Sequence, residues 1–87
     1  MTRSPNGPLD LQKLTEVINE VLEFKGSPAL TAWSDAQVLI DAPLAFDSND
    51  MAQLSTALEE RFGRDPFTAG ILPRTLGDLR QFFEKGA

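Results

Sequence analysis

The chain has 87 residues, the length of one small domain. It contains no Cys and no His, which excludes disulfides and thiolate metal sites and removes the commonest general base and metal ligand. Its 13 acidic and 8 basic residues give a formal charge of −5, which disfavours nucleic acid as a partner and favours basic proteins.

Residues 1–8 are polar and rich in Pro and Gly, and we expect them to form a flexible leader before a single domain over residues 9–87. This leader lacks the apolar stretch of a signal peptide. No apolar run approaches the ~20 residues that a helix needs to cross a bilayer. We therefore expect a cytoplasmic, monomeric protein without a membrane as its partner.

A first helix is predicted over about Asp10 to Phe24, because apolar residues recur there at helical spacing. Asp10 is placed to accept hydrogen bonds from the free amides of the first turn. Gly26 and Pro28 are placed to end the helix. Its apolar face comprises Leu11, Leu14, Ile18, Val21 and Leu22.

The connection from about Lys25 to Phe46 is long, and its apolar residues fit no single period. One interpretation is that it wraps the bundle with its apolar residues turned inward, Trp33 serving as an anchor on the core. The other is that Ser34 caps a short helical turn over residues 35–40. Pro43 ends the segment in either case.

A second helix is predicted over about Ser48 to Phe62, with Gly63 placed to end it in a left-handed conformation. At about 100° per residue, one face of this helix is apolar and the opposite face is polar. Ser48 falls between the two faces, at the edge of the core. The apolar stripe comprises Met51, Leu54, Leu58 and Phe62.

The remaining sequence predicts a weak turn over residues 68–72, closed by Pro73, and a last helix that starts at Thr75. Thr75 and Asp78 form a pair like a capping box. No segment alternates like a half-buried strand. The expected fold class is therefore all-α, a small bundle of three principal helices plus a short fourth, with a long loop between the first two. The buried face of the last helix comprises Leu76, Leu79, Phe82 and Phe83.

The segment from Leu44 to Met51 leads directly into the second helix. Taken alone, it predicts a helix start in which Asp47 is the N-cap and Asp50 closes a capping box. The free amides and the dipole at a helix start favour a negative group near Ser48, whereas the two aspartates oppose one. The local pattern by itself therefore favours an ordinary helix start over a functional site.

Several short motifs nevertheless follow one another in a definite order. The pair Asp47-Ser48 lies three residues after Leu44, residues 57–63 are Ala-Leu-Glu-Glu-Arg-Phe-Gly, and residues 75–79 are Thr-Leu-Gly-Asp-Leu. In this order and spacing, the chain resembles the acyl carrier protein family, which includes the peptidyl carrier domains. The resemblance covers about residues 9–83, nearly the whole chain.

This resemblance implies that a 4′-phosphopantetheine arm is attached to Ser48 and that Asp47 helps to position the site for the modifying enzyme. The thiol at the tip of the arm then holds an acyl or aminoacyl group as a thioester. The implied partners are a phosphopantetheinyl transferase, an acyl-loading ligase or transferase, and downstream synthase enzymes. The chain itself is expected to be a carrier without catalytic activity, in a specialised fatty-acid, polyketide or other secondary-metabolite pathway.

The resemblance also implies two surfaces, each with an ordinary alternative. The outer face of the second helix binds basic patches of partner enzymes, unless it is a plain solvated face. An apolar slot shelters the acyl group, unless its residues simply pack in the core. The implied partner face comprises Asn49, Asp50, Ala52, Gln53, Thr56, Glu59 and Glu60. The implied slot comprises Met51, Leu54, Ile71 and Leu72.

One position departs from the family pattern and keeps a second hypothesis open. The residue after the attachment serine is normally apolar in the family, but here it is Asn49. The alternative is a non-covalent interaction module that has a carrier-like fold and an unmodified serine. An independent enzyme is disfavoured, because nucleophile activation falls to carboxylates or to Lys13, Lys25 and Lys85.

Overall fold

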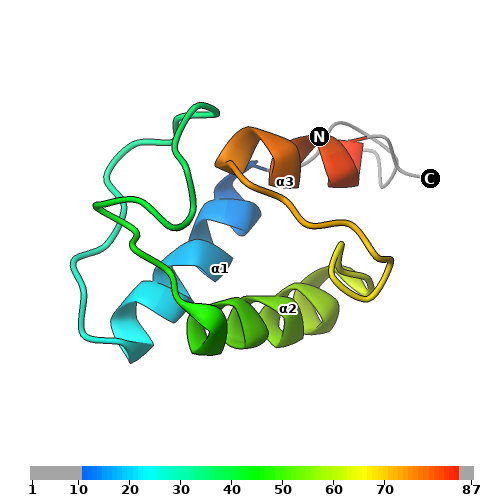
Figure 1. Ribbon diagram of the computed structural model, residues 1–87, viewed down its shortest axis with the longest axis horizontal. Helices are drawn as coiled ribbons and strands as arrows, with labels where there is room; N and C mark the ends of the chain where they lie inside the picture. The colour runs from blue at the N-terminus through cyan, green and yellow to red at the C-terminus, as the bar shows by residue number, and fades with distance from the viewer. Residues whose placement is uncertain (1–10, 85–87) are drawn as a thin grey trace, which may run out of the picture.

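The computed structural model describes residues 11–84, which form three helices joined by one long and one shorter connection (Figure 1). Residues 11–84 contain no strand, and no helix among them is long and apolar enough to span a membrane. The predicted leader over residues 1–8 and the predicted cap at Asp10 lie outside the described residues. The helices are α1 (Leu11–Phe24), α2 (Ser48–Phe62) and α3 (Leu76–Glu84).

The helix α1 buries one apolar face and ends where the sequence predicts. Gly26 has a φ of 81°, and the amide of Ser27 donates to the carbonyl of Leu22 at 2.8 Å. The amide of Gly26 donates to the carbonyl of Glu23 at 3.0 Å, which completes a Schellman motif. The buried residues of α1 are Leu14, Val17, Ile18, Val21 and Leu22.

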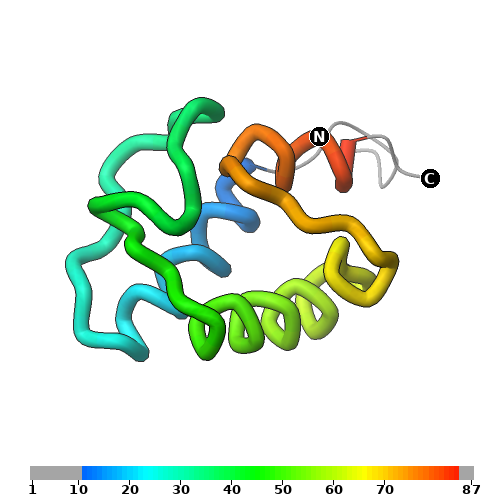
Figure 2. The backbone as a smooth tube through the Cα atoms, viewed as in Figure 1, coloured from blue at the N-terminus to red at the C-terminus, as the bar shows by residue number. Residues whose placement is uncertain are grey.

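The long connection wraps around one end of the molecule between α1 and α2, as Figure 2 shows. It contains no helix, so the helical turn over residues 35–40 is wrong. The wrapped loop of the first interpretation is confirmed, except that Ile40 is turned outward and is 67% exposed. Trp33 packs partly buried against the core, as expected. The apolar residues that this loop buries completely or nearly so are Leu39, Leu44 and Phe46.

The loop is held against the start of α3 by backbone hydrogen bonds. An isolated antiparallel bridge pairs Val38 with Thr75. The amide of Leu39 donates to the carbonyl of Arg74, and the amide of Leu76 donates to the carbonyl of Gln37, both at 2.9 Å. Because these pairs join distant parts of the sequence, they fix the path of a segment that has no helical structure of its own.

The helices α2 and α3 both begin at reciprocal caps, as predicted. At α3, the amide of Asp78 donates to Thr75 Oγ1 at 3.1 Å, and Asp78 Oδ2 accepts from the amide of Thr75 at 3.3 Å. At the other end of α2, Gly63 has a φ of 80° and donates to the carbonyl of Glu59. These caps satisfy backbone groups that helix ends leave without an intrahelical partner.

Residues 66–70 form a turn that overlaps the turn predicted over residues 68–72, and the expected short fourth helix is not found within residues 11–84. The carboxylate of Asp65 accepts hydrogen bonds from the amide of Thr68 at 3.0 Å and from its hydroxyl at 2.7 Å. Gly70 has a φ of 83°, and Pro73 follows it closely. A left-handed residue and a proline so near together stop the turn before a helix can propagate.

A single core joins the three helices and the long loop. The helix α1 packs against α2, and the ring of Phe62 in α2 lies 4.6 Å from that of Phe83 in α3. Outside this core, Arg61 of α2 forms ion pairs with Glu16 and Glu20 of α1. The arrangement leaves the first turn of α2 at the surface, beside the long loop and the end of α1.

Candidate functional site

Ser48 is the first residue of α2, and its side chain is exposed. The cap at Asp47 fixes the turn that contains it: Asp47 Oδ1 accepts from the amide of Asp50 at 2.9 Å, and the amide of Asp47 donates to Asp50 Oδ2 at 3.0 Å. The predicted capping box is therefore confirmed. Within residues 11–84, no group forms a hydrogen bond with the Ser48 hydroxyl, so this exposed hydroxyl is not tied to a neighbouring group.

Asp50 does not lie on the outer face of α2, and this part of the expectation is wrong. The residue is only 6% exposed, because the capping box turns its carboxylate back across the helix start. There, Asp50 Oδ2 forms an ion pair with the ammonium of Lys25 at 2.8 Å. Asp50 is therefore a structural acid of the helix start and offers little surface to a partner.

Lys25 is a component of this region that the sequence analysis missed. Its ammonium also donates to the carbonyls of Leu44 at 3.2 Å and Ala45 at 2.8 Å, and it lies 5.4 Å from the centroid of the Phe46 ring. No local pattern signals these contacts, because Lys25 directly follows α1 whereas its partners directly precede or begin α2. A lysine after a helix end is ordinarily a solvated charge.

The ion pair determines the charge of the helix start. Burial alone raises the pKa of the Asp50 carboxyl, but hydrogen bonds from Lys25 and from the amide of Asp47 outweigh it and hold this pKa below its ordinary value. Asp50 is thus ionised at neutral pH, and Lys25 balances its charge. Two acids, Asp47 and Asp50, are predicted to oppose an anion at Ser48. Asp50 is paired with Lys25, whereas the exposed Asp47 has no basic partner among residues 11–84.

The other residues of the implied partner face lie along one side of α2. Five are exposed, and Gln53 is half-buried. Gln53 lines a shallow hollow of about 230 Å³ together with Phe24, whose side chain is 76% exposed at the end of α1. The exposed members of the face are Asn49, Ala52, Thr56, Glu59 and Glu60.

The residues of the implied acyl slot are only partly brought together. Met51 and Leu72 line one groove of about 610 Å³, whereas Leu54 is fully buried in the core and does not line it. The long loop and the segment before α3 supply the rest of the lining, which the sequence analysis did not include. These further residues are Val38, Leu39, Ile40, Pro73, Arg74 and Thr75.

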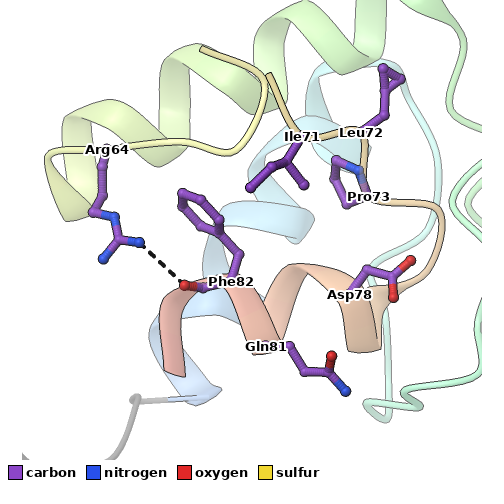
Figure 3. Close-up of a pocket in the computed structure, with 7 residues that line it drawn as sticks. All are labelled: Arg64, Ile71, Leu72, Pro73, Asp78, Gln81 and Phe82. Carbon is purple, nitrogen blue, oxygen red and sulfur yellow. Dashed lines mark hydrogen bonds between the residues drawn. The ribbon is translucent and has the colours of Figure 1, made fainter. Parts of the chain in front are cut away.

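Ile71 lies instead in an adjoining hollow of about 330 Å³, drawn in Figure 3. Leu72 and Pro73 line both spaces, so the two are neighbours. On the far side of the hollow, the guanidinium of Arg64 lies 4.4 Å from the centroid of the Phe82 ring and donates to the Phe82 carbonyl at 3.2 Å. Arg64 therefore ties the end of α2 to α3, which an ordinary surface charge would not do.

A metal site and known relatives were two other possible guides to function. Among residues 11–84, no group of three or more acidic side chains is placed to hold a metal ion. Comparison with protein-family models, with curated proteins and with solved structures gave no match. Function is therefore inferred from the motifs of the chain and from the geometry around Ser48.

Proposed function

We propose that this chain is an acyl carrier protein that holds an acyl or aminoacyl group as a thioester on a 4′-phosphopantetheine arm at Ser48. The observation that carries the proposal is the exposed Ser48 side chain at the first position of α2, directly after the capping Asp47. The three-helix bundle with its long wrapped loop suits such a carrier. The ordered motifs from Leu44 to Leu79 support the same assignment.

The attachment chemistry requires little of the carrier except an accessible hydroxyl. Ser48 Oγ attacks the phosphorus of coenzyme A that bears the pantetheine. A new O–P bond forms as the pyrophosphate P–O bond breaks, adenosine 3′,5′-bisphosphate leaves, and the serine proton passes to a base of the transferase. Ser48 fits this role, because its side chain is exposed and the capping box holds its backbone. The arm supplies the thiol that this chain, which has no Cys, cannot provide.

The groove beside the first turns of α2 supports an apolar cargo. Met51 lies within one helical turn of Ser48 and lines the groove with Ile40 and Leu72, both of which are largely exposed. Exposed apolar side chains gather into such patches where a ligand or partner covers them. We assign to this groove the transient sheltering of the acyl group.

Partner enzymes are proposed to approach the exposed face of α2. Glu59 and Glu60 provide charge there, and Asn49, Ala52 and Thr56 provide a neutral strip. The proposed partners are the phosphopantetheinyl transferase, an acyl-loading ligase or transferase, and downstream synthase enzymes. Exposed ion pairs contribute roughly 0–1 kcal/mol each, so these complexes are expected to be transient and to weaken with salt.

The direct test is to incubate the purified chain with coenzyme A and a promiscuous phosphopantetheinyl transferase and to measure its intact mass. The expected result is a gain of one phosphopantetheine, abolished by Ser48→Ala. Ser34→Ala, which changes an exposed serine of the long loop, is the matched control and should be modified like the wild type. A wild-type chain that several transferases leave unmodified would contradict the proposal.

A second candidate function is a non-covalent interaction module. The exposed Asn49 beside Ser48 favours it, because a polar side chain occupies a position that is normally apolar in carriers. This candidate requires stable binding of a partner that survives Ser48→Ala. Capture of the same partner by wild type and Ser48→Ala, without any gain of mass in the wild type, would favour it over the carrier.

A further inference from the structure

Lys25 uses all three of its ammonium protons on groups that flank Ser48. A lysine ammonium has three donors, and here they reach the carbonyls of Leu44 and Ala45 before Ser48 and the carboxylate of Asp50 after it. The side chain of Lys25 is 21% exposed, and that of Asp50 is 9% exposed. A solvated surface lysine would not be held so completely.

The backbone that Lys25 holds before Ser48 has an unusual conformation. Ala45 has a φ of 48°, which lies in the left-handed region that residues with a Cβ disfavour. Two contacts hold it there: its amide donates to the carbonyl of Asp41 at 2.9 Å, and its carbonyl accepts from Lys25 at 2.8 Å. Without the lysine, the backbone at Ala45, three residues before Ser48, loses one of these two contacts.

Lys25 also acts on the charge of the first turn of α2. Modification transfers a negatively charged phosphoryl group to Ser48, and Asp50 lies in the same turn of helix. The ion pair with Lys25 balances this carboxylate. If Lys25 were neutral, the remaining negative charge would oppose the incoming phosphoryl group, and it would be weakly screened because Asp50 is buried.

We infer that Lys25 is a positioning residue for the modification of Ser48: it fastens the segment before this serine and the helical turn after it to the end of α1, and it balances Asp50. This inference rests on the proposed carrier function. It predicts that loss of Lys25 slows the chemical step of modification more than it weakens binding of the transferase, because the ammonium is engaged with groups on both sides of Ser48 and is mostly covered.

The test measures kcat and KM for phosphopantetheinylation of the full chain, with the carrier as the varied substrate. For Lys25→Met, we expect kcat/KM to fall about tenfold, with most of the change in kcat. Lys13→Met is the matched control, because it removes the same charge from an exposed position near the start of α1. Its kcat/KM should stay within about twofold of the wild type.

Two further variants separate positioning from mere folding. Lys25→Arg keeps the charge and several donors and should restore most of kcat, whereas Lys25→Gln keeps fewer donors and no charge and should not. Circular dichroism establishes that each variant is folded, and if Lys25→Met is unfolded, Lys25→Gln replaces it in the comparison. Adding Asp50→Asn to the neutral variant removes the unbalanced charge and should recover part of kcat.

The inference is overturned if the folded neutral variants match the wild type in kcat, or if Lys25→Arg is as slow as they are. Failure of the carrier function itself gives a different result, because the wild type would then gain no mass. A fall confined to KM would also overturn the inference, since it would make Lys25 a contact of the transferase.

Discussion

Asp65 and Asp50 are two buried carboxylates that are stabilised in different ways. Asp50 is paired with a lysine, whereas Asp65, which is 3% exposed, accepts from the hydroxyls of Ser55 at 3.0 Å and Thr68 at 2.7 Å and from the amide of Thr68. Burial raises the pKa of Asp65, but these donors outweigh it and leave the pKa below its ordinary value. Both carboxylates therefore favour the folded state when they are ionised.

This predicts the direction of the pH dependence of stability. The pKa values of Asp50 and Asp65 are lower in the folded chain than the ordinary 3.8, so the unfolded chain binds more protons in acid. Their contribution is fully present above pH ~5 and is lost as the pH falls through 3.8 and below. Urea unfolding at a series of pH values from 7 to 3 measures it as a falling free energy of unfolding.

Asp65→Asn isolates one part of this dependence. At pH 7 the variant should lose about 1–3 kcal/mol, because an amide replaces a buried, ionised acceptor of three hydrogen bonds. The difference from the wild type should shrink as the pH approaches 3, because the carboxyl of the unfolded wild-type chain is protonated there and the advantage of the ionised form is lost. Asp41→Asn, at an exposed position of the long loop, is the control. A difference that stays constant with pH would show that packing, not charge, makes Asp65 stabilising.

At the scale of the elements, the starts of α2 and α3 and the ends of α1 and α2 are set by contacts within a few residues. Asp47 and Thr75 cap the starts of α2 and α3, and Gly26 and Gly63 end α1 and α2 in the left-handed conformation. The capping box at the start of α2 is the clearest example. The side chain of Asp47 accepts from the amide of Asp50, and the side chain of Asp50 accepts from the amide of Asp47. Such local contacts specify where a helix begins and ends, whatever it packs against.

Variants of Asp47 test whether its cap or its charge stabilises α2. Asp47→Ala should cost about 0.5–2 kcal/mol in the free energy of unfolding, because the amide of Asp50 loses its acceptor. Asp47→Asn should stay within about 0.5 kcal/mol of the wild type, since Asn is as good an N-cap as Asp. Urea unfolding at pH 7 measures both. If Asn destabilises α2 as much as Ala does, the charge at Asp47 and not its geometry is what matters.

At the scale of the whole molecule, stability depends on how α3 docks on the long loop. The amide of Gly77 donates to the carbonyl of Asp35 at 3.0 Å, and Arg80 holds the Asp35 carboxylate through bonds of 2.6 and 3.0 Å. The hydrogen bond from Arg80 and a second from the indole of Trp33 hold the pKa of Asp35 below its ordinary value. These contacts pin the middle of the loop to the first turns of α3.

Gly77→Ala tests this close approach. A Cβ at Gly77 would lie 2.9 Å from both the Cβ and the carbonyl oxygen of Asp35, so α3 or the loop must move. We expect a loss of about 1–3 kcal/mol, typical of overpacking, although Ala is the better helix former. Thermal and urea unfolding measure the change, and Gln81→Ala on the exposed face of α3 is the control. A variant at least as stable as the wild type would mean that helix propensity outweighs the contact.

The amino-acid sequence by itself determined the three helices, the end of α1, both ends of α2 and the capped start of α3. The predicted start of α2 at Ser48 and its end at Phe62 match the structure, and so does the predicted end of α1 at Phe24. This accuracy has a local cause, because apolar periodicity and capping involve residues no more than about four apart. The capped start of α2 at Ser48 was predictable for the same reason.

Tertiary structure alone decided the rest: the path of the long loop, the burial of Asp50, the contacts of Lys25 and the lining of the groove. The loop has no period, so its apolar residues carried no signal of which of them would be buried. Lys25 and Asp50 meet because the end of α1 and the start of α2 are brought together by that loop. Contacts of this kind depend on closing a long segment around a shared core, and no local pattern encodes that closure.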